Sequence, residues 1–380
     1  MNRIRVVYII DIFDTDLAGT ENQLLKMIRG LDATRFDVQL ICLTSHPWFE
    51  QHGATLGCPA VAFQIRDFKK PRTYWHLVKL IGHLRRLKPD VVQTFFPISN
   101  IVGVLAATLA GVPSILSSRR DYGEWMTARY LAATKLANRF ADKIVANSAA
   151  VRALTEQKEH LRNGKLQVIY NGMEVEHFAG LTPDPTLRRR LAIPEGDKVI
   201  GLVANFRPMK RHDTCVRALA EIARRRRDVT ALFLGYGPMR PALEQLARDL
   251  GIADKICFAG SQPDIRSYLA LMDVGVNCSE MEGLSNAVME YMAAGVPCVV
   301  SDSGGNRDLI THNVHGLTFP LGDHQTLAEH LLSLLDDAVL RRRLADGARK
   351  KILTEMTLPA MLAQYETLYA DLVDRTIRAS

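Results

Sequence analysis

Short apolar runs rich in β-branched residues alternate with helical patterns along the whole chain, in two successive series. Runs of this kind are typical of buried parallel strands, and the helices between them would cover both faces of a sheet. The two series therefore predict two Rossmann-like α/β domains. The strand-like runs are 6–10, 38–43, 91–94, 114–117 and 144–146 in the first series, and 199–203, 230–234, 256–259, 274–278 and 298–301 in the second.

A segment with the composition of a linker separates the two series. It contains Gly180, Pro183, Pro185 and Pro194 but no long apolar run. Clustered proline and glycine are typical of connections between domains. We therefore expect a first domain over 1–172, a linker over 173–196 and a second domain over 197–357.

The second series is followed by one more helical pattern, from about residue 358 to residue 375. Its apolar residues recur at helical spacing, so this helix must cover apolar surface elsewhere in the protein. The stripe consists of Met361, Leu362, Tyr365, Leu368, Tyr369 and Leu372.

One uncharged stretch, residues 91–118, could be mistaken for a membrane span. A spanning helix needs about 20 apolar residues, and Pro97, Gly111 and Pro113 interrupt this stretch. We expect instead a strand, a buried helix over about 98–110 and a second strand. The first apolar run of the chain stops after a few residues, which predicts a strand and no signal peptide.

Composition and charge restrict the class of protein less than the hydrophobic pattern does. With 47% hydrophobic and 23% charged residues among 380, the chain is expected to form soluble globular domains. Its formal charge of +7 suits a nucleotide diphosphate, an anionic membrane surface or nucleic acid, but no helix-turn-helix, RRM or zinc-finger pattern favours nucleic acid. Six cysteines without a C-x-x-C pair predict free thiols in a reducing compartment and no zinc site.

The most informative motif follows the strand-like run 274–278. It reads Glu282-Gly-Leu-Ser-Asn286, with Glu290 eight residues after Glu282, and a helix is predicted to start near Asn286. Free amides at a helix start bind phosphate with help from the helix dipole, and Gly283 lets the backbone approach a ligand closely. Carboxylates accept hydrogen bonds from adjacent hydroxyls, so both glutamates suit sugar rings. A capped helix with a surface acid is the alternative interpretation.

Three further turns after strand-like runs carry related chemistry. The turn after the first run of the second series holds Arg207 and Lys210, whose charges would oppose the charge that develops on a diphosphate leaving group. A solvated basic loop is the alternative. Gly235 and Gly237 follow the next run and are weak evidence for a nucleotide. Residues 302–308 form another turn of small and polar residues.

Together these residues resemble the family 4 retaining glycosyltransferases, over nearly the whole chain. The most specific mark is the E-x7-E pair of Glu282 and Glu290. The pattern from Met361 to Tyr369 resembles the family's closing helix, which crosses back to the first domain. The other motifs, in family order, are Val168-Ile169-Tyr170-Asn171-Gly172-Met173 at the domain junction, Gly235-x-Gly237-Pro238, Phe258-x-Gly260 and Glu282-Gly283.

The resemblance implies a GT-B fold, in which two Rossmann-like domains face each other across a cleft and 358–380 joins the first domain. It implies that Glu282 holds the transferred sugar, that Lys210 and Arg207 grip the diphosphate and that Glu290 binds the ribose. It also implies transfer with retention of configuration and with no metal or other cofactor. The remaining donor-binding positions would be Gly19, Gly235, Gly237, Gly283, Leu284, Ser285 and Asn286.

The first domain is expected to supply the acceptor side. Arg119, Arg120 and Asp121 lie at the end of a predicted strand and are candidates to line it. Many family members have a histidine after the strand at 91–94, and this chain has none there. Asp14-Thr15-Asp16 resembles the metal-binding D-x-D motif of the other major glycosyltransferase fold, but it lies in the wrong domain for that role.

A second acceptor-side feature has two interpretations, a basic amphipathic surface near a lipid-linked acceptor or an ordinary core-facing helix. Its residues are Trp125, Met126, Tyr130, Leu131 and Phe140, with Arg129, Lys135 and Arg139.

The leading hypothesis is sugar transfer from a nucleotide diphosphate sugar to a saccharide or lipid-linked saccharide, in the synthesis of a lipopolysaccharide, exopolysaccharide or glycolipid. The expected location is cytoplasmic, at the inner face of the membrane, with peripheral membrane association and no nucleic-acid partner. A nucleotide-sugar epimerase of the same fold and a catalytically degenerate binding protein are the alternatives.

Overall fold

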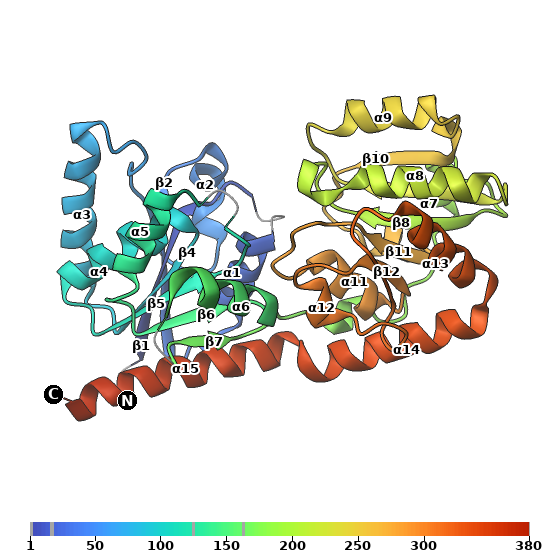
Figure 1. The fold of residues 1–380 in the computed structure, drawn as a ribbon. Helices are drawn as coiled ribbons and strands as arrows, with labels where there is room; N and C mark the ends of the chain where they lie inside the picture. The colour runs from blue at the N-terminus through green and yellow to red at the C-terminus, as the bar shows by residue number, and fades with distance from the viewer. Residues whose placement is uncertain (1–2, 16–18, 124–125, 162–163, 380) are drawn as a thin grey trace. The chain divides into compact units, whose positions relative to one another are not determined.

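The protein is described from a computed structural model of residues 3–15, 19–123, 126–161 and 164–379. The chain forms two compact units, Met1–Gly172 together with Leu358–Ser380, and Met173–Thr357. Each unit contains one parallel sheet with helices on both faces (Figure 1). The prediction of two Rossmann-like α/β domains is therefore confirmed.

The sheet of the first unit has seven parallel strands. They are β1 (Ile4–Ile12), β2 (Phe36–Thr44), β3 (Ala60–Ala62), β4 (Val91–Phe95), β5 (Ser114–Arg119), β6 (Lys143–Ala146) and β7 (Leu166–Val168), in the order β3-β2-β1-β4-β5-β6-β7. The central strand β1 contributes Val6, Tyr8 and Ile10 to one hydrophobic core and Val7 and Ile9 to another. Burial on both faces explains why this strand reads as a continuous apolar run.

Helices cover both faces of this sheet. They are α1 (Gly19–Gly30), α2 (Pro47–His52), α3 (Pro71–Leu87), α4 (Val104–Ala110), α5 (Ala128–Ala137), α6 (Ala149–Glu159) and α15 (Leu358–Ala379), with the short turns η1 (Gly53–Thr55) and η2 (Ser99–Gly103). Helices α3, α4 and α5 pack on one face, and α1 and α15 on the other (Figure 1). The helix predicted over 98–110 is present, with η2 as its π-helical first turn.

The last helix, α15, belongs to the first unit. The stripe that the sequence predicted is buried against β1 and α1, with Tyr369 and Tyr365 almost wholly inside. The Tyr369 hydroxyl donates to Gln93 on β4 and lies 3.1 Å from the Tyr8 hydroxyl on β1. Gln93 in turn donates to the Ser118 hydroxyl on β5 at 2.9 Å. A buried polar chain therefore fixes α15 across three strands.

The sheet of the second unit has six parallel strands in the order β10-β9-β8-β11-β12-β13. They are β8 (Lys198–Val203), β9 (Val229–Leu234), β10 (Ile256–Gly260), β11 (Val274–Asn277), β12 (Cys298–Ser301) and β13 (Leu317–Phe319). In both sheets the first strand of the unit lies inside the sheet. The chain adds strands to one side of it and then crosses to the other side, which creates a switch point.

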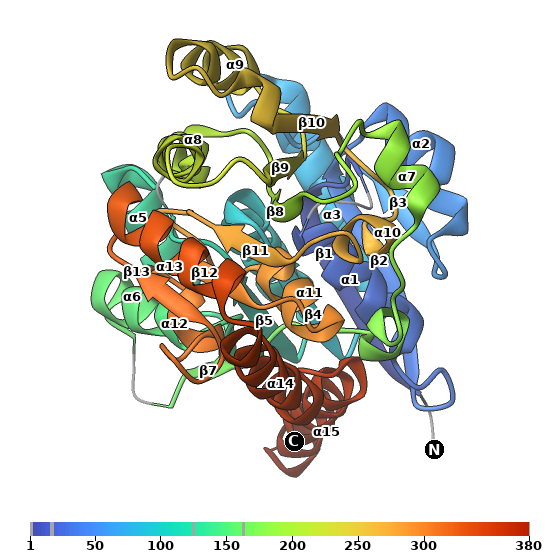
Figure 2. The same ribbon diagram turned by 90° about the vertical axis from the view of Figure 1, so that its right-hand side faces the viewer.

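The helices of the second unit also form two layers. Helices α8 (His212–Ala223), α9 (Arg240–Asp249) and α13 (His324–Asp336) pack on one face, while α11 (Asn286–Ala294) covers the other and packs against α14 (Ala338–Glu355) (Figure 2). The remaining elements are α7 (Pro185–Arg190), α10 (Arg266–Leu269), α12 (Asn306–Leu309), η3 (Val175–Phe178), η4 (Pro208–Lys210) and η5 (Ala253–Lys255).

The structure adds detail where the sequence pattern was weak. Strands β3, β7 and β13 were not predicted, because each has only three residues at the edge of its sheet, which is too short a run to show a pattern. The segment expected to be a linker contains η3 and α7 and belongs to the second unit. The Arg188 guanidinium holds the end of α7, since it donates to the carbonyls of Pro194 and Asp197 at 2.7 and 2.5 Å.

Among the residues that the structure describes, no helix combines the length and apolarity needed to cross a bilayer. The uncharged stretch around 91–118 forms β4, η2, α4 and β5. All six cysteines are free thiols.

The hydroxyl chain of α15 gives a test of its attachment to the first unit. Tyr369→Phe leaves the buried amide oxygen of Gln93 without its donor, which should cost about 1–3 kcal/mol. The matched control is Tyr291→Phe in α11, because the Tyr291 hydroxyl accepts from the Val203 amide of β8 at 2.8 Å. Hydrogen exchange read by mass spectrometry should speed up in β1, β4 and β5 for Tyr369→Phe, and in β8 and β11 for Tyr291→Phe. The same pattern in both variants would contradict the assignment.

Candidate active site

Two of the predicted catalytic residues lie at the switch point of the second sheet. Strands β8 and β11 are neighbours, but the chain leaves β8 towards β9 and leaves β11 towards β12, on opposite sides. Loops that diverge in this way leave a crevice at the carboxyl ends of the strands, where ligands bind in open α/β sheets. Lys210 lies in the loop after β8, and Glu282 in the loop after β11.

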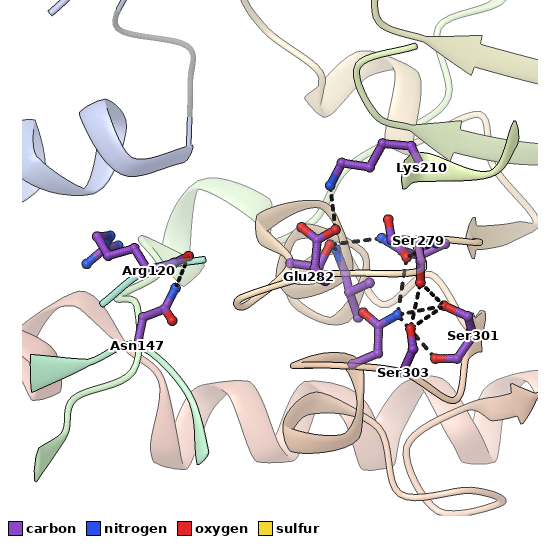
Figure 3. A network of polar contacts seen from close by, with 11 residues as sticks. Arg120, Asn147, Lys210, Ser279, Glu282, Ser301 and Ser303 are labelled. Carbon is purple, nitrogen blue, oxygen red and sulfur yellow. Dashed lines mark hydrogen bonds and ion pairs between the residues drawn. The ribbon is translucent and has the colours of Figure 1, made fainter. Parts of the chain in front are cut away.

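The structure brings these two side chains into direct contact as an ion pair between Lys210 Nζ and Glu282 Oε2 (Figure 3). Only 22% of the lysine side chain and 13% of the glutamate side chain are exposed. A partly buried charge pair of this kind holds one cation and one carboxylate at a fixed place, with a low local dielectric around them. It can present a positive charge and a hydrogen-bond acceptor to one ligand.

Backbone hydrogen bonds join the loops around this pair to one another. The loop after β8 bonds to the loop after β9, from the Phe206 amide to the Tyr236 carbonyl at 2.8 Å. It also accepts from the loop after β11, from the Glu280 amide to the Met209 carbonyl at 2.8 Å. That loop is bonded to the loop after β12, where the Gly305 amide donates to the Glu282 carbonyl at 2.7 Å. Four adjacent strand-end loops therefore form one connected support.

Glycine is required in this support for steric reasons. A Cβ atom at Gly235 would lie 2.0 Å from the Ala204 carbonyl oxygen, and one at Gly237 would lie 2.5 Å from that of Phe206. Both residues also have φ between +140° and +155°, a region that side chains disfavour. The sequence predicted close approach by a nucleotide at these glycines. In the structure they already pack against the loop after β8.

The helix that follows Glu282 starts with a side-chain cap. The Ser285 hydroxyl accepts from the Val288 amide at 3.3 Å and is itself bonded by the Asn277 amide group at 3.0 Å. Asn306 donates to the Asn277 oxygen at 3.2 Å, which ties the cap to α12. Ser285, a predicted donor-binding residue, therefore has its hydroxyl engaged in the cap, and its backbone amide stays the candidate group.

The other predicted residues of this motif surround the cap. Leu284 is buried, Gly283 and Asn286 are half-buried, and Glu290 lies half-buried one turn into α11. Below them, the Ser301 and Ser303 hydroxyls both donate to the Ser279 carbonyl at 2.6 Å (Figure 3). The sequence indicated a small polar turn at 302–308, but no role was predicted for these serines or for Asn277. The sequence feature that could have identified them is their position at the ends of β11 and β12.

The predicted cations after β8 occupy different environments. Arg207 is exposed, and its guanidinium makes no ion pair or hydrogen bond with any residue that the structure describes. Arg211, which the sequence analysis did not select, lies 3.3 Å from Asp213 and 3.7 Å from Glu280, and these carboxylates raise its pKa. His212 is buried against Phe206, and burial lowers its pKa to about 4, so it is neutral at pH 7.

In the first unit, the predicted acceptor-side residue Arg119 is paired within the protein. Its guanidinium forms a buried bidentate pair with Glu159 at 2.8 and 2.9 Å and also donates to Asn138 at 2.9 Å. These bonds link the end of β5 to α5 and α6. The guanidinium is therefore engaged by the protein itself, and the place of Arg119 on the acceptor side stays a prediction.

Arg120 is the second candidate for that side. Its side chain is half-buried and donates to the Asn171 side-chain oxygen at 2.6 Å, while its carbonyl accepts from Asn147 at 3.3 Å (Figure 3). Burial lowers the pKa of Arg120, and Tyr365 and Glu21 oppose that effect. Its Nε has no hydrogen-bond partner among the residues that the structure describes. Asp121 is exposed and accepts from the Gly123 amide at 2.9 Å.

A pocket of the first unit opens at the carboxyl ends of β4 and β5. Arg119, Arg120 and Asp121 all line it, so the three acceptor-side candidates lie at one hollow of this unit. Its other lining residues include Phe96, Pro97, Tyr122 and Lys158. The predicted donor-binding Gly19 begins α1 of the same unit. Asp16 of the D-x-D motif and Trp125 lie outside the described residues.

Comparison with protein families covers both halves of the chain. Residues 183–351 match the glycosyl transferases group 1, and residues 17–177 match Glycosyltransferase Family 4. The chain belongs to glycosyltransferase family 4. The resemblance seen in its motifs is therefore confirmed.

Curated relatives within the matches are glycosyltransferases with different donors. N-acetyl-alpha-D-glucosaminyl L-malate synthase of Bacillus anthracis is 31% identical over 56% of this chain, and the match spans 55% of that enzyme. UDP-Gal:alpha-D-GlcNAc-diphosphoundecaprenol alpha-1,3-galactosyltransferase of Escherichia coli is 26% identical over 94% of this chain and 95% of its own. GDP-mannose-dependent alpha-mannosyltransferase of Mycobacterium tuberculosis is 28% identical over 96% of this chain and 97% of its own.

Solved structures of similar fold cover nearly the whole chain. Anabaena HepE in complex with UDP has a TM-score of 0.85 at 21% identity, over 97% of this chain and 100% of that chain. Sucrose-phosphate synthase from Thermosynechococcus elongatus has a TM-score of 0.81 at 20% identity, over 100% of both chains. At this level of identity the likeness establishes the GT-B fold.

The packing of the strand-end loops predicts the effect of a single methyl group. In Gly305→Ala the new Cβ would lie 2.1 Å from the Gly283 carbonyl oxygen, so the loop that carries Glu282 must move. We expect a loss of about 1–3 kcal/mol in unfolding free energy and at least a tenfold loss of sugar transfer. The control is Gly196→Ala, where nothing lies within 4 Å of the new Cβ. Thermal unfolding and transfer assays on both variants test this, and equal behaviour would refute it.

Glu21 in the first turn of α1 predicts a pH dependence of stability. Burial is the main cause that raises its pKa from 4.5 to about 7; nearby Asp14 adds to the rise, and Arg120 opposes it. The folded state therefore binds a proton more tightly than the unfolded state, and this stabilisation, about 3 kcal/mol, is lost as the pH rises from about 4.5 to about 7. Glu21→Gln should gain stability relative to the wild type between pH 5 and pH 8 in urea unfolding. A difference that stays constant over this range would show that Glu21 is not the cause.

Proposed function

We propose that the protein transfers a sugar from a nucleotide diphosphate donor to a saccharide or lipid-linked saccharide, with retention of configuration. The observation that carries this proposal is the ion pair of Lys210 and Glu282 at the switch point of the second sheet. One partner supplies the charge that a diphosphate needs, and the other supplies the acceptor that sugar hydroxyls need. Family membership supports the same reaction class.

Each group has a defined task in this proposal. Lys210 and the exposed Arg207 oppose the negative charge that grows on the diphosphate as its bond to the sugar C1 breaks. The acceptor hydroxyl forms the new bond to C1, and its proton passes to an oxygen of the leaving diphosphate. Glu282 accepts hydrogen bonds from the sugar, the amides at the start of α11 hold phosphate, and Glu290 binds the ribose.

The donor class is supported by structural neighbours of the chain. HepE was solved with UDP and with UDP-glucose, while the mycobacterial relative is named for GDP-mannose. We propose a nucleotide diphosphate sugar as donor and assign no base. A role in lipopolysaccharide or exopolysaccharide synthesis is supported by the E. coli relative, which is named for a lipid-linked acceptor, and by a Rhizobium meliloti lipopolysaccharide core glycosyltransferase.

The proposal includes transfer without a metal ion, in the cytoplasm at the inner face of the membrane. Lys210 and Arg207 place fixed positive charge beside the loop of Glu282, and fixed cations can take the part that a divalent ion has on a diphosphate. Transfer should therefore continue at the same rate in EDTA. NMR of the product's anomeric proton tests retention.

The first experiment is a thermal-shift screen against UDP, GDP, ADP and their common sugar conjugates. A ligand that binds only the folded state at 100 times its Kd adds about 2.7 kcal/mol of stability, which is a shift of several degrees. We expect one nucleotide to shift the transition, and Glu290→Gln to weaken that shift. A flat response to every nucleotide would refute the donor site.

Transfer assays with the selected donor then separate the roles of the charged residues. Glu282→Gln and Lys210→Met should each lower kcat by about 10²–10³, since both act on the reacting part of the donor, whereas Glu290→Gln should mainly raise KM. The matched control is Lys198→Met. Lys198 pairs with Asp273 at 3.0 Å at the amino ends of β8 and β11, the opposite edge of the same sheet. Full activity in Glu282→Gln or Lys210→Met would remove the assigned catalytic roles.

A further inference from the structure

The outer face of α3 in the first unit carries large apolar side chains that the protein itself does not cover. Tyr74, Trp75 and Val78 are 55%, 54% and 67% exposed. On the inner face of the same helix, Leu80 and Leu84 are fully buried against the sheet. The helix therefore has two apolar sides, and only one of them is used by the fold.

The charges on this outer face all have one sign. Helix α3 contains Arg72, Lys79, Arg85 and Arg86 and no acidic residue. All four are exposed. The spacing of 72, 75, 79 and 86 follows the helical repeat, so basic and aromatic side chains form one stripe along the helix. Lys79 Nζ lies 3.3 Å from the centre of the Trp75 ring, a cation–π contact that orients both groups.

The loop before α3 extends the stripe. Phe68 is exposed, and Lys69 and Lys70 beside it are exposed as well. The Tyr74 hydroxyl donates to the Phe68 carbonyl at 3.1 Å, which attaches this loop to the helix. The single acidic residue of the loop, Asp67, lies 3.7 Å from Lys70 and is partly neutralised by it.

The neighbouring helices on the same face of the sheet have the same character. Neither α4 nor α5 contains an acidic residue. Leu109 at the end of α4 is exposed, as are Leu136 and Phe140 at the end of α5. The Arg85 guanidinium donates to the Leu109 carbonyl at 2.9 Å, which joins the end of α3 to that of α4. Figure 1 shows α3 at the edge of the first unit, with α4 and α5 beside it.

We propose that the outer face of α3, from Phe68 to Arg86, is a docking surface for an anionic phospholipid bilayer. Tryptophan and tyrosine are the side chains that lie at the boundary between head groups and acyl chains. Basic residues beside them bind anionic head groups, and such a helix lies in the plane of the interface without crossing it. The apolar and charge patterns on α3 meet both requirements at once.

The inference rests on the proposed function, because a lipid-linked acceptor lies at a membrane surface and an enzyme that uses it must reach that surface. It also relocates the surface that the sequence suggested around residues 125–140, since α3 carries the longer basic and aromatic stripe. Vesicle binding by this face needs neither donor nor acceptor. A failed nucleotide shift would therefore count against the proposed function alone, and failed vesicle binding against this inference alone.

The test is co-sedimentation of the full chain with vesicles of phosphatidylcholine alone and of phosphatidylcholine with phosphatidylglycerol at 3:1. We expect binding to the anionic vesicles, at least tenfold weaker binding to the zwitterionic ones, and weakening when salt is raised from about 0.1 M to about 0.5 M. Fluorescence of Trp75, taken as the difference between the wild type and Trp75→Phe, should shift to the blue and be quenched by brominated lipid.

Two double variants and their matched controls decide the location of the surface. Trp75→Ser/Val78→Ser and Arg85→Gln/Arg86→Gln should each weaken anionic-vesicle binding at least tenfold. The controls change the same residue types on the second unit, where Val339 and Leu353 are exposed and Arg224 and Arg227 are exposed. Val339→Ser/Leu353→Ser and Arg224→Gln/Arg227→Gln should stay within twofold of the wild type.

Three outcomes would overturn the inference. They are no sedimentation of the wild type with anionic vesicles, equal binding to both kinds of vesicle, and equal loss in the α3 variants and their controls. Circular dichroism and thermal unfolding of each variant confirm that it is folded. Because all the substituted side chains are exposed, we expect unfolding temperatures close to that of the wild type.

Discussion

The candidate site depends on backbone contacts between loops that follow adjacent parallel strands of the second unit. An amide of one loop donates to a carbonyl of the next, from the loop after β9 across to the loop after β12. Such contacts need short side chains, and glycines at 235, 237 and 305 provide them, because a Cβ at any of the three would overlap a carbonyl oxygen. The position of Glu282 and Lys210 therefore depends on these glycines as much as on the attraction between the two charged side chains.

The first unit is organised by a different constraint, the burial of polar groups on and beside its central strands. Tyr369, Gln93 and Ser118 form a hydrogen-bonded chain that holds α15 across the sheet. Buried polar groups must be paired, and Arg119 satisfies this rule with Glu159 and Asn138. The next residue, Arg120, has an Nε without a hydrogen-bond partner among the residues that the structure describes, so the two neighbouring arginines are satisfied to different degrees.

The basic residues of the protein also occupy two kinds of environment, one partly buried and one exposed. Lys210 is half-buried and paired with a carboxylate, which suits a group that must hold one ligand. The basic side chains of α3 are exposed and have no acidic residue on their own helix, which suits an extended anionic surface. The net charge of +7 by itself does not distinguish a residue that binds one ligand from a residue of an anion-binding surface. The burial of each basic side chain and the sign of the charges around it make this distinction.

Sequence alone determined the fold class and most strands, because a strand buried on both faces must be apolar throughout, as 6–10 and 199–203 are. It also selected Glu282, Glu290 and Lys210, since these residue types follow strand ends in a family pattern. It could not place the three-residue edge strands, which are too short to show a pattern.

Only the tertiary structure decided which residues meet. Nothing in the sequence pattern indicated that Arg119 pairs with Glu159, 40 positions away. Asn277, Ser279, Ser301 and Ser303 gained a role only when β11 and β12 were seen as neighbours. The exposed side of α3 was equally hidden, because an apolar stripe in a sequence does not say which face the core covers. Contacts and burial depend on residues that are distant in the chain, and the local sequence pattern does not show which distant residues these are.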